Sequence, residues 1–143
     1  MCNLKKTASR LLTDPLHAIV GLDLMSTGLI LLTNRRYFFW PPWPAWITAF
    51  ENDSIVGFIG LCTGAGMIWW SMAADKSIRA NRLLIPTASA YYALLSMIEL
   101  MHGIFAPAGT PHMYISGLSE LAMMLITLYM AKASPTRRSR ADK

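Results

Sequence analysis

Four side chains that can carry charge interrupt otherwise apolar stretches of this sequence. Asp23, Glu99 and Glu120 each lie within a run of apolar residues, and His102 follows Glu99 by three positions. On a helix, this spacing places the Glu99 and His102 side chains on one face. Carboxylates and imidazoles exchange protons, bind cations or ligate transition metals. These four residues are therefore the candidates for chemistry.

Charged acidic residues are energetically unfavourable inside apolar runs such as these. A charged Asp at the centre of a membrane helix costs about 2.5–3.5 kcal/mol on insertion scales, so such a group normally faces protein or water. No Lys or Arg lies inside any of the apolar runs to neutralise the acids. Like-charged carboxyls in a low dielectric cannot all ionise. We therefore expect Asp23, Glu99 and Glu120 to face the interior, with at least one proton retained. His17 and His112 lie near the ends of runs, and we expect them to be solvated.

The elements that must position these residues follow from hydropathy. The chain of 143 residues is 54% hydrophobic and 15% charged, and its apolar residues come in long runs. A helix needs about 20 such residues to cross a hydrocarbon core of ~30 Å. The sequence predicts an all-α integral membrane protein with one transmembrane domain over residues 15–132. Its four spans cover residues 16–33, 54–74, 83–105 and 113–131, and their short connections favour an up-down bundle.

Basic segments flank this domain and set its orientation. Residues 1–14 combine apolar side chains at helical spacing with Lys5, Lys6 and Arg10, which is typical of an amphipathic segment at the membrane surface or of a solvated basic start. Residues 133–143 form a basic tail that we expect to be disordered. If successive connections lie on alternate sides of the membrane, eleven Lys and Arg residues fall on one side and two on the other. This asymmetry predicts an inner-membrane protein with both termini on the cytoplasmic side.

The same distribution identifies the expected partner. The net charge of +5 is compatible with nucleic-acid binding. However, the basic residues flank apolar runs, so we expect the lipid bilayer as partner and no nucleic acid.

Glycines mark the second span as a packing surface. Gly57, Gly60 and Gly64 recur along it at helical spacing. Small residues let helix backbones approach closely, and dispersion between the helices then stabilises the contact. The partner helix could lie in the same bundle, where residues 87–93 offer a second surface of small residues. It could also belong to a second copy of the chain or to another membrane subunit.

Three interpretations of the buried acids remain open from the sequence. In the first, a site formed by Asp23, Glu99 and Glu120 binds or relays a proton or a cation. In the second, Glu99 and His102 ligate a transition metal with Glu120 and Asp23. Glu-x-x-His is a ligand spacing of di-iron proteins, but those proteins use two such motifs and this chain has one. No other cofactor is evident. In the third, the acids are protonated and only hydrogen-bond helices together through Ser96, Ser119, Tyr91 or Tyr92.

Enzymatic chemistry has little support, because the chain contains no Gly-x-Ser-x-Gly motif and no phosphate-cradling glycine loop. In gross layout, with short-looped spans and a basic tail carrying Arg137, Arg138 and Arg140, the chain resembles small phage or bacterial membrane proteins of holin type. The resemblance lies in architecture and transfers no functional residue. We expect a small polytopic inner-membrane protein with a buried acidic site that handles a proton or a cation. The alternatives are a holin-like oligomer that permeabilises the membrane and a purely structural accessory subunit.

Overall fold

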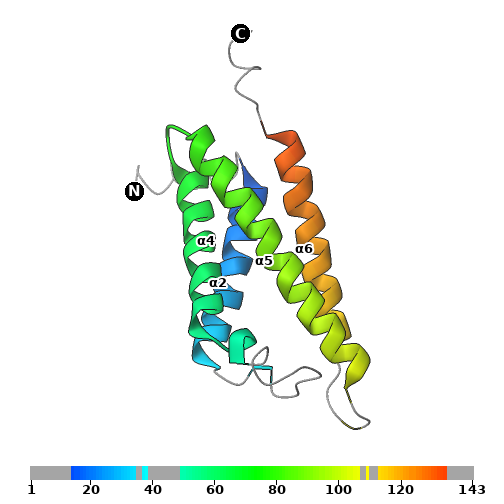
Figure 1. Cartoon of the computed structure of the whole chain (residues 1–143). Helices are drawn as coiled ribbons and strands as arrows, with labels where there is room; N and C mark the ends of the chain where they lie inside the picture. Colours follow the sequence, from blue (N-terminus) through cyan, green and yellow to red (C-terminus); the bar gives the residue numbers. More distant parts are fainter. Residues whose placement is uncertain (1–13, 35–36, 39–48, 107–108, 110–112, 135–143) are drawn as a thin grey trace.

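The chain is all-helical in its described parts. The computed structural model describes residues 14–34, 37–38, 49–106, 109 and 113–134, so the predicted N-terminal segment and basic tail lie almost entirely outside it. Four helices in these ranges are long and apolar enough to cross a membrane (Figure 1). They are α2 (Pro15–Thr33), α4 (Ser54–Met72), α5 (Ile78–Phe105) and α6 (Tyr114–Ala133).

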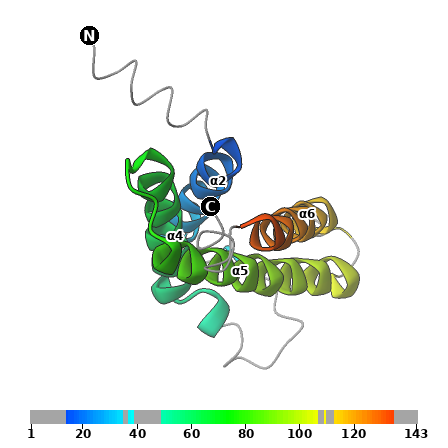
Figure 2. The same cartoon turned by 90° about the horizontal axis from the view of Figure 1, so that it is seen from above.

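Helix α5 begins earlier than the span expected from the sequence. The Ser77 hydroxyl oxygen accepts a hydrogen bond from the Ala80 N–H at 3.3 Å, and this cap starts the helix at Ile78. Pro86 therefore lies inside the helix and not in its first turn, where it removes one backbone hydrogen bond. With 28 residues the helix exceeds the length needed to cross a bilayer. It runs obliquely from the end of α4 toward the start of α6 (Figures 1 and 2).

Helices α2 and α4 are antiparallel and approach so closely that only glycine fits between them. A Cβ atom on Gly64 would lie 2.5 Å from the carbonyl oxygen of Gly21, and one on Gly57 would lie 2.8 Å from that of Gly28. Both neighbours are backbone atoms and cannot move aside. The glycine surface of α4 is therefore covered by α2, and not by the small residues at positions 87–93.

The third glycine of this surface faces two helices. A Cβ atom on Gly60 would lie 2.5 Å from the hydroxyl oxygen of Tyr91 on α5 and 3.3 Å from the Cα of Gly28 on α2. Gly60 thus makes room for a large aromatic side chain where α2, α4 and α5 meet. This contact joins the α2–α4 pair to α5.

Helices α5 and α6 form a second antiparallel pair, held by short polar side chains. Near one end, the Ser96 hydroxyl donates to the carbonyl oxygen of Gly117 at 2.9 Å. Further along, the Thr127 hydroxyl donates to the Ser89 hydroxyl oxygen at 3.0 Å. Small side chains at these positions permit a close approach, and the hydrogen bonds fix the register of the pair.

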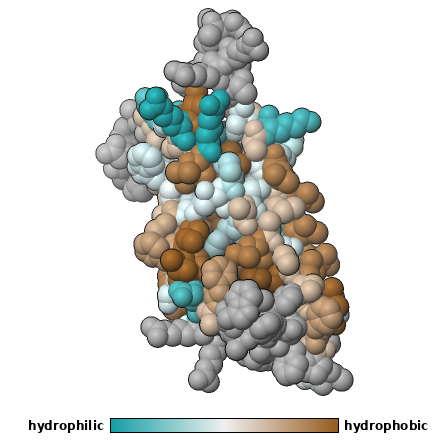
Figure 3. All heavy atoms as spheres, viewed as in Figure 1, coloured by the Kyte–Doolittle hydropathy of each residue, from teal (hydrophilic) through white to brown (hydrophobic). Residues whose placement is uncertain are grey.

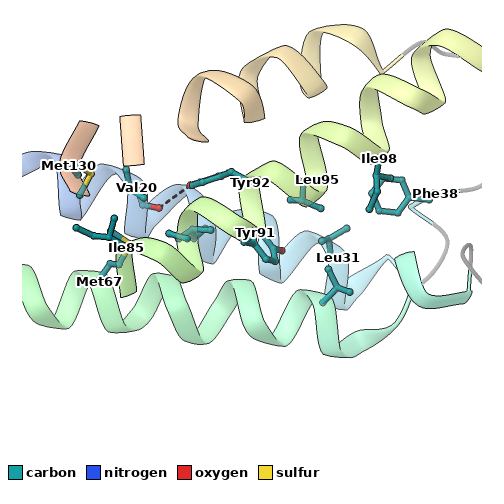
Figure 4. Close-up of a cluster of buried hydrophobic side chains, with 13 residues drawn as sticks. Val20, Leu31, Phe38, Met67, Ile85, Tyr91, Tyr92, Leu95, Ile98 and Met130 are labelled. Atoms are coloured by element: carbon teal, nitrogen blue, oxygen red, sulfur yellow. Dashed lines mark hydrogen bonds between the residues drawn. The ribbon is translucent and has the colours of Figure 1, made fainter. Parts of the chain in front are cut away.

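An apolar core joins the two pairs. Val20 and Leu24 of α2, Met67 of α4 and Ala88 of α5 are fully buried. Tyr92 reaches across this core, and its hydroxyl oxygen lies 3.3 Å from the carbonyl oxygen of Val20 (Figure 4). The two pairs are thus packed on each other through side chains from three helices.

The outer surface is also apolar. Large hydrophobic side chains face outward on every helix, among them Ile19, Phe58, Leu83 and Ile115, whose exposed fractions run from 57% to 85%. On the face shown in Figure 3, most of the strongly hydrophilic residues lie at the end where α4 joins α5, and hydrophobic residues alternate with residues of intermediate hydropathy over much of the rest. Such a surface is typical of a lipid-facing protein.

The backbone contact between α2 and α4 can be tested at Gly64. We expect Gly64→Ile to destabilise the protein by about 1–3 kcal/mol or more, because the new side chain would overlap the α2 backbone. The matched control is Ala65→Ile, since Ala65 is exposed on the same helix. Thermal unfolding of both variants in detergent gives the comparison. Equal stability of the two variants would show that this face of α4 meets lipid.

Candidate functional site

A cavity of about 180 Å³ lies between α2, α5, α6 and the segment that follows α2. Two carboxyl side chains from different helices line it, Glu99 from α5 and Glu120 from α6. The hydroxyl-bearing residues Thr27, Tyr37 and Ser116 line it as well. At about 30 Å³ for each molecule in the liquid, the cavity has room for several waters. The structure therefore brings two of the three predicted acids to one polar cavity.

Glu99 is the more deeply buried of the two acids, with an exposed fraction of 3%. The side chains of Ser116 and Tyr37 lie beside its carboxyl group and line the same cavity. Its Oε2 atom is buried and has no hydrogen-bond partner within the described residues. A buried carboxyl oxygen in this position can accept a proton, a cation or a water molecule from the cavity.

Glu120 and Asp23 extend this acidic region. Glu120 is half-buried and lies within electrostatic range of both Glu99 and Asp23. The Asp23 carboxylate accepts a hydrogen bond of 2.8 Å from the Tyr92 hydroxyl, so it is held at the interface of α2 and α5. All three predicted acids thus belong to one interior region. In the described helices, basic side chains lie only near helix ends, at Arg79, Arg82 and Lys132.

His102 points toward a different partner. Its Nε2 atom lies 3.8 Å from an oxygen of Glu51, and both side chains are buried. Its Nδ1 atom lies 2.9 Å from the carbonyl oxygen of Ile98, to which Nδ1–H donates. Among the residues that the structure describes, no three His, Cys, Asp or Glu side chains are grouped to hold a metal ion. The transition metal at Glu99 and His102 therefore stays a prediction.

Two short segments between α2 and α4 complete the site. Phe38 is buried against the His102 ring, with the ring centroids 5.2 Å apart. Asn52 fixes Phe38 through two hydrogen bonds, accepting from its N–H at 3.1 Å and donating to its carbonyl oxygen at 3.0 Å. This anchoring holds the neighbouring Tyr37 against Glu99. Burial, together with the charge of Glu99, raises the pKa of the Tyr37 hydroxyl, so this hydroxyl stays neutral and can both donate and accept.

Sequence reasoning missed Glu51, Tyr37 and Ser116. Glu51 follows an aromatic, proline-rich connection and looks like an exposed charge, yet its exposed fraction is 2%. Two of the hydrogen-bond partners expected from the sequence do not serve the acids: Ser96 bonds the backbone of α6, and Ser119 is exposed. The signal that could have pointed to Ser116 is its position four residues before Glu120 on the same helical face.

A separate polar cluster lies at the opposite end of the bundle, beside a pocket of about 240 Å³. The His17 Nε2 atom lies 2.9 Å from the Asn81 side-chain oxygen, and Asn81 donates to the Ser134 hydroxyl oxygen at 2.9 Å. The His17 ring stacks on Trp70 with the ring centroids 4.3 Å apart. The expectation of a solvated His17 is therefore wrong, because these contacts bury it. His112 lies outside the described residues.

Comparison with known proteins adds no functional assignment. No protein-family model matches the chain, and no curated protein or solved structure matches it either. Function therefore has to be argued from the four helices and the acidic cavity.

Proposed function

We propose that this chain is a small multi-pass inner-membrane protein that reversibly binds a proton or a small cation in the Glu99–Glu120 cavity. One observation carries the proposal: two carboxyl side chains from neighbouring helices line one cavity inside a set of helices apolar enough to cross a membrane. Two carboxylates this close in a low dielectric repel each other and are poorly solvated. A bound proton or cation relieves both costs.

Magnitudes argue against a purely structural role for a charged acid. Hydrogen bonds between membrane helices contribute only about 0.6 kcal/mol on average. A charged Asp at membrane depth costs about 2.5–3.5 kcal/mol on insertion scales. Bonds of this size from the neighbouring Tyr37 and Ser116 would therefore be too weak to offset a charged glutamate at that position. A Gln or Ser in place of Glu99 could join the helices without this cost, so an acid here needs a further reason.

The orientation belongs to the proposal too. We place four spans in an up-down bundle, with both termini in the cytoplasm and lipid on the outer surface. Two observations support this arrangement. The first residues of α2 and the last residues of α6 line the same pocket. In addition, eleven of the thirteen Lys and Arg residues fall on that side when sides alternate along the chain.

The acidic site can be tested with a hydrophobic carbodiimide, which modifies protonated carboxyls in apolar surroundings. We expect the purified full chain in lipid vesicles to be labelled at Glu99 or Glu120. Labelling should be lost in the double variant E99Q/E120Q, because an amide cannot react. The control is Asp75→Asn, which removes an exposed acid in the connection between α4 and α5 and should leave labelling unchanged. Peptide mass spectrometry locates the adduct.

Two results would contradict the proposal. The first is an absence of labelling at both glutamates at every pH tested, with E99Q/E120Q as stable as the parent. The second is that expression of the chain abruptly collapses the membrane potential, and that expression of the E99Q/E120Q variant does so as well. That second result would favour the holin-like alternative, in which the acids have no part.

The orientation is checked independently with topology reporters fused after Lys143 and within the connection between α2 and α4. We expect the first fusion to report a cytoplasmic position and the second an external one, because the basic residues are concentrated on the first side. An external C-terminus would overturn the proposed arrangement.

A further inference from the structure

The lining of the cavity between α2, α5 and α6 indicates the class of its ligand. We propose that the cavity binds a small organic ammonium ion. The charged nitrogen of this ion pairs with Glu99 and Glu120, and its short alkyl part contacts the aliphatic side chains of the wall. This inference rests on the proposed function and adds to it the chemical class of the cation.

The two glutamates offer acceptors that no described residue uses. The Oε2 atoms of Glu99 and Glu120 are both buried, and neither has a hydrogen-bond partner in the part of the chain that the structure describes. Both residues line the cavity, Glu99 from α5 with 3% exposure and Glu120 from α6. An ammonium group carries three N–H donors and no acceptor. It therefore matches a cavity whose unpartnered buried atoms are carboxyl oxygens.

Aliphatic side chains form part of the same wall. Ile30 and Leu31 of α2 and Leu95 of α5 line the cavity together with the acids. A proton or a metal ion gains nothing from these side chains, because each binds only to electron-donating atoms such as oxygen and nitrogen. An alkyl chain placed against them is removed from water, which is favourable. Small-molecule sites usually combine such an apolar lining with a few polar groups that fix the orientation of the ligand.

The volume of the cavity suits an organic ion better than a metal ion. At about 30 Å³ for each molecule in the liquid, 180 Å³ corresponds to about six waters, so an ammonium ion with a short alkyl chain fits. A hard metal cation needs about six oxygen ligands around one point. Within the described ranges, no three His, Cys, Asp or Glu side chains are grouped closely enough to hold a metal. A metal ion would thus have to draw most of its ligands from water.

The cavity also has an accessible side through which such an ion can enter. Ile30 is 47% exposed, and Thr27, Ser116 and Glu120 are half-buried. These four residues lie on α2 and α6, which belong to different helix pairs (Figure 2). The accessible side therefore lies between the two pairs, within an outer surface that is largely apolar. An alkyl chain is compatible with lipid there, whereas a bare metal ion is strongly disfavoured in apolar surroundings.

Isothermal titration calorimetry of the full chain in detergent tests this inference, with n-butylammonium chloride as the probe. Butan-1-ol has the alkyl chain without the charge, and NaCl has the charge without the chain, so we expect neither to bind. We expect E99Q/E120Q to weaken butylammonium binding by about tenfold or more, because hydrogen bonds to charged groups are lost. The matched control is Asp75→Asn, which removes an exposed acid and should leave binding unchanged.

A second variant tests the space in the cavity and keeps both acids. Thr27→Leu enlarges a side chain of the wall, and we expect it to weaken butylammonium binding by about tenfold or more, because the ion would be overpacked. Labelling of the glutamates by the carbodiimide should persist. The matched control is Ser26→Leu, a comparable change at an exposed position of the same helix. If Thr27→Leu fails to fold, Ser116→Val on α6 replaces it.

The outcomes separate this inference from the function on which it rests. Absence of butylammonium binding, or binding that E99Q/E120Q or Thr27→Leu leaves unchanged, would overturn the organic ion as ligand. Binding of Na⁺ that E99Q/E120Q abolishes and Thr27→Leu retains would overturn it as well. In each of these cases, carbodiimide labelling at Glu99 or Glu120 would keep the proposed function, with a proton or a metal ion as ligand. A chain that shows neither labelling nor cation binding would contradict the proposed function itself.

Discussion

The cost of keeping carboxyl groups inside an apolar bundle without a basic partner governs this structure. Glu99, Glu120 and Asp23 occupy one interior region, and the basic side chains of the described helices lie near helix ends. A charge in such a place is tolerated only if water, hydrogen bonds or a bound positive charge offset the lost solvation. The cavity, the hydroxyls around it and the proposed proton or cation each supply part of that compensation.

The helix packing makes room for this compensation. Glycines bring α2 and α4 into backbone contact, so that pair has no interior space of its own. Helix α5, lengthened at its N-terminal end by the Ser77 cap, crosses this pair obliquely and packs on α6. The polar cavity forms among α2, α5 and α6, and the anchored Phe38 and Tyr37 adjoin it. The closely packed α2–α4 pair and the obliquely crossing α5–α6 pair thus leave one polar cavity within an otherwise apolar protein.

Local sequence patterns predicted the helices but only part of the site. Long apolar runs identify membrane-crossing helices because hydropathy is a property of consecutive residues. The position of Asp23, Glu99 and Glu120 within such runs likewise pointed to an interior site. Contacts between residues that are far apart in the sequence could not be predicted from such local patterns. The burial of Glu51 depends on His102, and that of His17 depends on Asn81 and Trp70, so both look like solvated polar residues in the sequence.

Two further features could not be predicted from local sequence patterns for the same reason. The glycines of α4 face Gly21 and Gly28, which stand seven residues apart on α2 among large apolar side chains and form no obvious stripe. The start of α5 depended on a single cap at Ser77 within a polar connection, where hydropathy carries no signal. Both features are decided by contacts that form only when the helices meet.

The central claim is that Glu99 and Glu120 share one interior cavity with the Tyr37 hydroxyl. A crystal structure of the full chain grown from a lipidic phase, at a resolution that shows ordered water, tests this most directly. Our account predicts that both carboxyls line the same cavity, that Tyr37 contacts Glu99, and that ordered water or a bound cation lies between the two acids. A structure in which Glu99 and Glu120 face lipid on different sides of the bundle would contradict it.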